Sequence, residues 1–136
     1  MQTQTDKLHV IFGTGPLGSA VMRSLVRRGQ TIRMVNRTGR PSPATGPKPE
    51  VEIMAADAYD AISASRAVAG ATHVYQCAQP AYHRWPEQFP ALQRTILEAT
   101  AAVGAKLVVA ENLYMYGDPQ GRALTEDTPH RPHTRK

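Results

Sequence analysis

The stretch over residues 7–18, KLHVIFGTGPLG, joins a short apolar and β-branched run to a glycine-rich turn and the start of a helical pattern. The run over 7–12 predicts a buried strand, and Pro16 suits the first turn of a helix. Gly13, Gly15 and Gly18 have the spacing G-x-G-x-x-G, which is informative when it lies between a strand and a helix. The stretch therefore predicts a strand, a glycine loop and a helix in direct succession.

Each glycine of this loop has its own chemical reason. Gly13 permits the tight turn, Gly15 lets the backbone approach a pyrophosphate, and Gly18 lets the helix pack closely on the strand. Free N–H groups and the dipole at the helix N-terminus favour negative charge there. A structural turn without a ligand is the alternative, which this context disfavours. We predict a dinucleotide site at Gly13, Thr14, Gly15, Pro16, Leu17 and Gly18.

Outward from the loop, the pattern predicts a helix with Leu17, Val21 and Leu25 on its inner face and Gly29 at its end. Further strands are expected over 31–35, 51–54, 72–77 and 106–110. A helix is expected over roughly 59–68. The inner face of a second, longer helix, ended by Gly104, is marked by Phe89, Leu92, Ile96 and Val103. Near-continuous apolar strands alternating with helices predict an α/β fold, a Rossmann-type doubly wound parallel sheet of about five strands.

Composition limits the class of protein. Hydrophobic residues make up 41% and charged residues 20% of the 136 residues, as in an ordinary globular domain. The single cysteine, Cys77, excludes an internal disulfide framework. No apolar run approaches the ~20 residues that a membrane span needs. The N-terminus is polar and does not read as a secretory signal, so a cytoplasmic protein without a membrane partner is expected.

Basic charge is concentrated in the first third of the chain. Residues 7–48 contain eight Lys and Arg and no acidic residue, whereas the remainder is net −3. Such a block suits a polyanionic partner, either a nucleotide phosphate or a nucleic acid. A solvated helix face is enough to explain Arg23, Arg27 and Arg28. No nucleic-acid-binding motif is present and aromatic residues are few, so no nucleic-acid partner is expected.

The end of the second expected strand bears on cofactor preference. NAD-preferring sites place an acidic residue about 20 positions after the glycine loop to bind the ribose 2′-hydroxyl. This region carries Asn36, Arg37 and Thr38 and no carboxylate. Arg37 can pair with a 2′-phosphate, and its neighbours can add neutral hydrogen bonds. NADP(H) is therefore the preferred cofactor, with NAD(H) possible.

The chain resembles the extended and atypical short-chain dehydrogenase/reductases, the NAD-dependent epimerase/dehydratase group. The resemblance is carried by GTGPLG (13–18), Asp57 after the third strand, CAQP (77–80), AENLYMYG (110–117) and LTEDTPHRP (124–132). By this resemblance Asp57 approaches the adenine. The path to the ribose and nicotinamide would be lined by Cys77, Ala78, Gln79 and Pro80.

The same resemblance points to a departure in the catalytic residues. Asn112 stands where the family usually has serine or threonine. The family's tyrosine, a proton donor paired with a lysine four residues later, would fall at Lys136, so this chain lacks the pair. Asn112 could orient a substrate but cannot act as an acid. Tyr114, Tyr116 and Lys136 are the candidate replacement donors, although a tyrosine beside a strand is more often a packed aromatic.

These features define two alternative functions. The first is the NADP(H)-binding portion of an epimerase/dehydratase-like oxidoreductase acting on a small carbonyl or sugar-nucleotide substrate, with residues 1–136 alone inactive. The second is a non-catalytic NADP(H)-binding or redox-sensing module. We expect residues 1–117 to form the Rossmann domain. Residues 118–136 would form a proline-rich segment leading to a missing catalytic helix and substrate region, so that the fold is C-terminally truncated. No metal site is expected, and homo-oligomers are possible.

Overall fold

The computed structural model describes residues 7–133 and has one five-stranded sheet, ordered β3-β2-β1-β4-β5, in which every neighbouring pair is parallel. The strands are β1 (Leu8–Phe12), β2 (Thr31–Asn36), β3 (Val51–Ala55), β4 (Ala71–Gln76) and β5 (Lys106–Val109). This arrangement confirms the expected Rossmann-type sheet. The first strand of the chain lies at its centre, and the connections leave β1 toward β2 on one side and return to β4 on the other.

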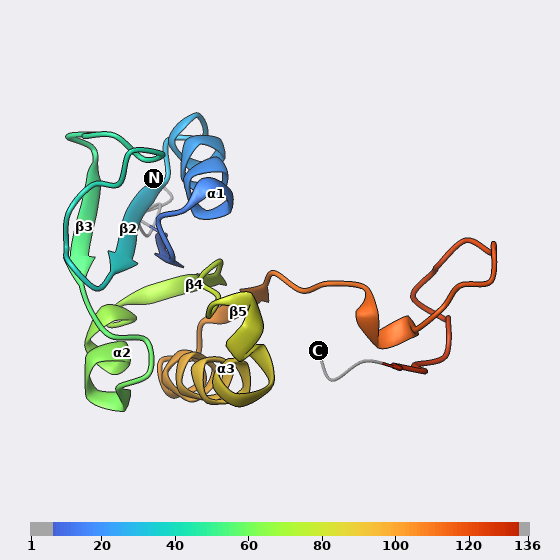
Figure 1. Cartoon of the computed structure of the whole chain (residues 1–136). Helices are drawn as coiled ribbons and strands as arrows, with labels where there is room; N and C mark the ends of the chain where they lie inside the picture. The colour runs from blue at the N-terminus through green and yellow to red at the C-terminus, as the bar shows by residue number, and fades with distance from the viewer. Residues whose placement is uncertain (1–6, 134–136) are drawn as a thin grey trace.

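Helices cover both faces of the sheet, with α1 (Pro16–Val26) on one side and α2 (Ala61–Ala67) and α3 (Trp85–Ala102) on the other (Figure 1). Alternate residues of each strand therefore face different cores. Val10 and Phe12 pack with α2 and α3, while Ile11 packs with Met22 and Leu25 of α1. Burial on both faces explains why the central strand β1 is apolar at every position except His9.

The inner face of α1 differs from the expected one. Gly18, Met22 and Leu25 are buried against the sheet, whereas Leu17 is 47% exposed and Val21 is only half-buried. The apolar spacing did not predict this face because Gly18, which has no hydrophobic side chain, lies where α1 comes closest to β1.

Two other expected elements are also shifted. The shorter helix begins at Ala61 because the Asp60 carboxylate caps it, accepting a hydrogen bond from the Ser63 N–H at 2.7 Å. On α3 the inner face is Leu92, Ile96 and Ala99, while Val103 lies beyond the last helical residue and is 40% exposed. A short 3₁₀ turn, η1 (Tyr82–Arg84), leads into α3.

Residues after β5 leave the sheet as an extended arm that folds back on itself (Figure 1). The arm contains one 3₁₀ turn, η2 (Tyr114–Tyr116), and the Arg131 N–H donates a hydrogen bond to the Met115 carbonyl at 2.9 Å. None of the helices within residues 7–133 is long and apolar enough to cross a membrane.

A buried histidine on β1 makes the stability of the fold depend on pH. His9 is 5% exposed and stacks on His73 with ring centroids 4.7 Å apart. Its Nε2 lies 3.1 Å from Gln30 Oε1, and its Nδ1 lies 3.1 Å from the Tyr75 hydroxyl. Burial lowers the pKa of His9; the Gln30 hydrogen bond opposes this shift, and the charges of His73 and Lys7 add to it.

We expect the free energy of unfolding to fall as the pH drops from 7 to 5. Below the ordinary histidine pKa of about 6.5, the unfolded chain binds a proton at His9 that the folded chain binds only at lower pH, so acid favours unfolding. Urea unfolding at several pH values measures this slope. His9→Gln removes the titrating group and should give a shallower slope, and equal slopes in the two proteins would contradict the assignment.

Candidate functional site

The glycine loop and four other segments meet at the carboxyl edge of the sheet, where parallel strands all end. The loop follows β1, and β4 lies next to β1 where the direction of the connections reverses. In doubly wound sheets this switch point is where ligands bind. The Gly13 N–H donates to the Val35 carbonyl and the Cys77 N–H to the Phe12 carbonyl, each at 2.9 Å. These bonds tie the loop to the ends of β2 and β4.

Two of the three loop glycines are required by the protein's own packing. Gly13 has φ +107°, and a Cβ placed there would lie 2.7 Å from the Ala78 nitrogen. A Cβ on Gly18 would overlap the Gly13 carbonyl oxygen. Any side chain at either position would displace backbone, so these glycines fix the turn and the contact between α1 and β1.

The packing of the described residues does not require a glycine at position 15. Its φ of −75° is open to any residue, and, apart from its chain neighbours Thr14 and Pro16, a Cβ placed there would meet no atom of the described residues within 4 Å. The space in front of Gly15 is therefore left open by this part of the chain. A glycine at this position allows another molecule to approach the backbone closely.

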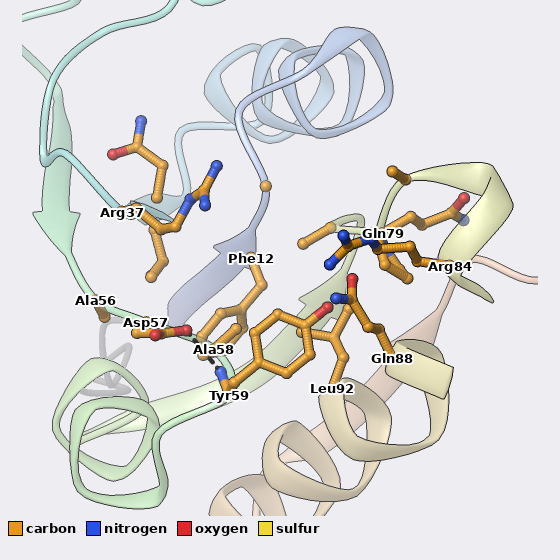
Figure 2. A pocket seen from close by; sticks show the side chains of 16 residues that line it. Phe12, Arg37, Ala56, Asp57, Ala58, Tyr59, Gln79, Arg84, Gln88 and Leu92 are labelled. Carbon is orange, nitrogen blue, oxygen red and sulfur yellow. Dashed lines mark hydrogen bonds between the residues drawn. The ribbon is translucent and has the colours of Figure 1, made fainter. Parts of the chain in front are cut away.

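Two adjoining cavities occupy this edge. The larger, about 510 Å³, lies between the ends of β1, β2 and β3, the segment after β4, and the start of α3 (Figure 2). The second, about 450 Å³, runs beside the glycine loop past Leu17 and Cys77. Gly13, Ala78 and Gln79 line both, so the two form one elongated site.

Charged groups stand around the larger cavity. Arg37 and Arg84 extend into it from opposite sides, with Asp57 and Tyr59 along its lower rim (Figure 2). Asp57 Oδ1 accepts a hydrogen bond from the Tyr59 N–H at 2.9 Å. Burial raises the pKa of the Tyr59 hydroxyl, the Asp57 charge raises it further, and Arg37 opposes both. Two guanidinium groups facing one cavity make it suited to an anionic ligand.

The residues expected to flank Arg37 are already occupied within the chain. Asn36 Nδ2 donates to Thr14 Oγ1 at 3.1 Å and to the Arg40 carbonyl at 2.8 Å. Asn36 Oδ1 accepts from the Thr38 and Gly39 N–H groups at 3.1 and 2.7 Å. Within residues 7–133 the Arg37 side chain makes no hydrogen bond or ion pair. Of this group, Arg37 is the side chain available to a ligand.

The segment after β4 lines both cavities. Ala78, Gln79 and Pro80 line the larger cavity, and Cys77 lines the smaller one. Burial raises the pKa of the Cys77 thiol, so it stays protonated near neutral pH. A raised thiol pKa disfavours the reactive thiolate at Cys77.

Two of the candidate catalytic residues, Asn112 and Tyr114, lie on the arm after β5. Asn112 Oδ1 accepts the Tyr114 N–H at 2.8 Å, which shapes the turn, and the Tyr114 hydroxyl is 3.1 Å from that of Tyr82. Asn112 also lines a cavity of about 240 Å³ beside Trp85 and Phe89. Lys136 lies outside the described residues.

Tyr59, Arg84 and Gln88 also line the larger cavity. Of these, Tyr59 and Gln88 were not identified from the sequence. The one signal for Tyr59 was its place two residues after Asp57 at a strand end. Gln88 sits on the first turn of α3, and nothing in the local pattern shows which way this turn faces.

Comparison with known families and structures gives a consistent result. The model of the NmrA-like family matches residues 4–133. No curated protein matches the chain.

Among solved structures, a UDP-glucose 4-epimerase of Thermus thermophilus in complex with NAD is 25% identical, with a TM-score of 0.77 over 94% of this chain and 45% of that one. A UDP-glucose 4-epimerase from Bifidobacterium longum in complex with NAD⁺ and UDP is 18% identical, with a TM-score of 0.75 over 92% and 43%. A short-chain dehydrogenase/reductase superfamily protein from Agrobacterium tumefaciens with bound NAD is 24% identical, with a TM-score of 0.73 over 94% and 40%. These matches confirm the resemblance seen in the sequence. The chain spans less than half the length of each structure.

Proposed function

Because the chain belongs to the NmrA-like family, we propose that it forms the dinucleotide-binding half of an oxidoreductase-like protein and that the dinucleotide is NADP(H). The observation that carries the proposal is the open backbone at Gly15, where a Cβ would meet no atom of the described residues within 4 Å other than those of its chain neighbours. That space lies at the N-terminus of α1, which attracts phosphate through its dipole and free N–H groups. The NAD complexes of the similar epimerases support a nicotinamide dinucleotide as the ligand.

The preference for NADP(H) rests on Arg37. Its guanidinium faces the larger cavity at the end of β2, where an NAD site would carry an acidic residue. The carboxylate on this rim, Asp57, follows β3 instead and suits the adenine. We propose Arg37 as the partner of the 2′-phosphate, with Asn36 and Thr38 shaping the turn that presents it.

Arg37→Ala should remove most of the difference in affinity between NADPH and NADH. A charge-assisted hydrogen bond contributes roughly 1.5–3 kcal/mol, or about tenfold or more in affinity. Calorimetric titration of the full chain with each cofactor measures the ratio of the two Kd values. Arg94→Ala, the same change of charge on an exposed position of α3, is the matched control and should leave that ratio unchanged. Equal NADPH and NADH affinities in the unaltered protein would refute the preference.

For the whole protein we propose a small carbonyl compound or sugar nucleotide as substrate. The neighbouring epimerases act on UDP-glucose by name, and one binds UDP. A non-catalytic NADP(H)-binding or redox-sensing role is the second candidate. It is favoured by Lys136, which stands where the family has its proton-donating tyrosine. Asn112 also replaces the family's usual serine or threonine, and its side-chain oxygen already caps the Tyr114 turn. Cofactor consumption measured on a panel of such substrates separates the two candidates.

A further inference from the structure

Three hydroxyl groups converge on one carbonyl of the glycine loop. The Ser42 hydroxyl donates to the Thr14 carbonyl oxygen at 2.5 Å, and the Ser19 and Thr45 hydroxyls each lie 3.3 Å from that oxygen. Thr45 Oγ1 is 3.0 Å from both Ser19 Oγ and Ser42 Oγ. Ser19 is fully buried and Thr45 is 5% exposed. We call Ser19, Ser42 and Thr45 the hydroxyl clamp.

The clamp joins the glycine loop to a distant part of the chain. Ser19 belongs to α1, but Ser42 and Thr45 come from the proline-rich connection between β2 and β3. On the other side, the side-chain amide of Asn36, at the end of β2, donates a hydrogen bond to the Thr14 hydroxyl at 3.1 Å. Thr14 is therefore fixed at both its side chain and its carbonyl by residues outside the glycine loop.

Holding this carbonyl fixes the direction of the next N–H. The peptide between Thr14 and Gly15 is trans, so the Gly15 N–H points opposite to the Thr14 carbonyl. The carbonyl faces the clamp, and the N–H consequently faces away from it. Within residues 7–133 the Gly15 N–H donates no hydrogen bond. It is left as a donor on the open side of the loop.

This donor matters more because of the residue that follows. Pro16 is the first residue of α1 and has no N–H, so one of the donors that a helix N-terminus offers to an anion is missing. If the Thr14–Gly15 peptide turned over, a carbonyl oxygen would take the place of the N–H and would repel a phosphate. Turning it over would also leave the clamp hydroxyls without their acceptor, so the clamp makes the N–H-outward orientation the stable one.

We propose that Ser42, with Thr45 and Ser19, is a positioning residue that aims the Gly15 N–H at the dinucleotide pyrophosphate. The inference rests on the proposed function and assigns part of its affinity to the β2–β3 connection. These hydroxyls do not touch the ligand and act only through the Thr14–Gly15 peptide. Their removal should therefore weaken ligands that carry a pyrophosphate and spare ligands that lack one.

The test compares two clamp variants and one matched control variant, each with two ligands. Ser42→Ala and Thr45→Val each remove one hydroxyl, and Thr45→Ser keeps it as the matched control. NADPH contains the pyrophosphate, whereas adenosine 2′-monophosphate carries only the 2′-phosphate and no phosphate at the 5′ position. Calorimetry gives the NADPH affinity, and NMR titration gives that of the weaker ligand. Thermal melts of every variant show whether the fold is retained.

We expect Ser42→Ala and Thr45→Val to weaken NADPH binding about two- to tenfold, the usual range for one lost neutral hydrogen bond, while Thr45→Ser binds as the unaltered protein does. Affinity for adenosine 2′-monophosphate should not change. Equal weakening of both ligands would show a merely structural role, and unchanged NADPH affinity would overturn the inference outright.

An NMR measurement on the Gly15 amide tests the positioning role even if one of the variants fails to fold. In a ¹⁵N-labelled sample the Gly15 amide resonance should shift on adding NADPH to the unaltered protein, and should shift less in whichever clamp variant melts normally. An unmoved Gly15 resonance in the unaltered protein, despite NADPH binding, would refute the positioning role. Absence of binding by both NADPH and NADH would instead refute the proposed function.

Discussion

Gly15→Val is expected to raise the Kd for NADPH and NADH by about a hundredfold or more while leaving the melting temperature close to that of the unaltered protein. The backbone at Gly15 is extended, with φ −75° and ψ −169°, which valine adopts readily. Apart from its chain neighbours, no described residue has an atom within 4 Å of the new Cβ, so we expect the folded protein to have room for the side chain. The proposed pyrophosphate position does not.

Two measurements together test this prediction. A thermal melt reports on the fold, and the rise in melting temperature caused by saturating NADPH reports on binding, because a ligand stabilises only the state that binds it. Gly15→Ala should give a smaller loss, since its single methyl intrudes less. If Gly15→Val keeps the cofactor-induced rise in melting temperature, the loop is a structural turn and the binding proposal fails.

Gly18→Ala is expected to produce the opposite pattern, a large loss of stability. Its Cβ would overlap the Gly13 carbonyl oxygen and lie 2.9 Å from the Gly13 carbonyl carbon and 3.4 Å from Ile11 Cγ2. Two of these three atoms belong to Gly13, whose own N–H is held by a hydrogen bond to Val35. The helix would have to move away from β1. From the usual effects of overpacking, we expect the free energy of unfolding to fall by about 3 kcal/mol or more.

Urea unfolding of Gly18→Ala beside Gly15→Ala tests this expectation. Both variants add one methyl group to the same loop, so any difference between them reports on the packing around each position. The free energy of unfolding should fall sharply for the first and hardly change for the second. Similar values for the two variants would mean that α1 can shift on the sheet without penalty.

The sequence was sufficient for the sheet and for the glycine loop because both depend on local patterns. Strands buried on two faces read as apolar runs, and β1 runs straight into Gly13, which only glycine can occupy. The inner face of α1 could not be read in the same way. Its contact with β1 is made by Gly18, which carries no hydrophobic signal, and this contact turns Leu17 outward.

The rest of the site depends on contacts between distant residues. Arg84 and Tyr59 come from different connections and meet only because the sheet brings the ends of its strands to one edge. Ser42 and Thr45 lie in a connection whose four prolines predict an irregular loop. The prolines do not predict which part of the fold this loop contacts. Hydroxyl groups in such loops are common, and only the folded backbone shows that these two reach Thr14.

The central place of β1 also has a consequence for how the chain folds. β1 pairs on one edge with β2, where Leu8 lies opposite Thr31. Its other edge pairs with β4, which begins at Ala71, much later in the chain. A chain emerging from the ribosome can form β1, α1, β2 and β3 while that edge is still unpaired and Val10 and Phe12 still lack α2 and α3. Closing β1 against β4 brings together residues far apart in sequence, and we expect it to be the slow step of folding. Until it closes, the unpaired edge is the part of the nascent chain most exposed to aggregation.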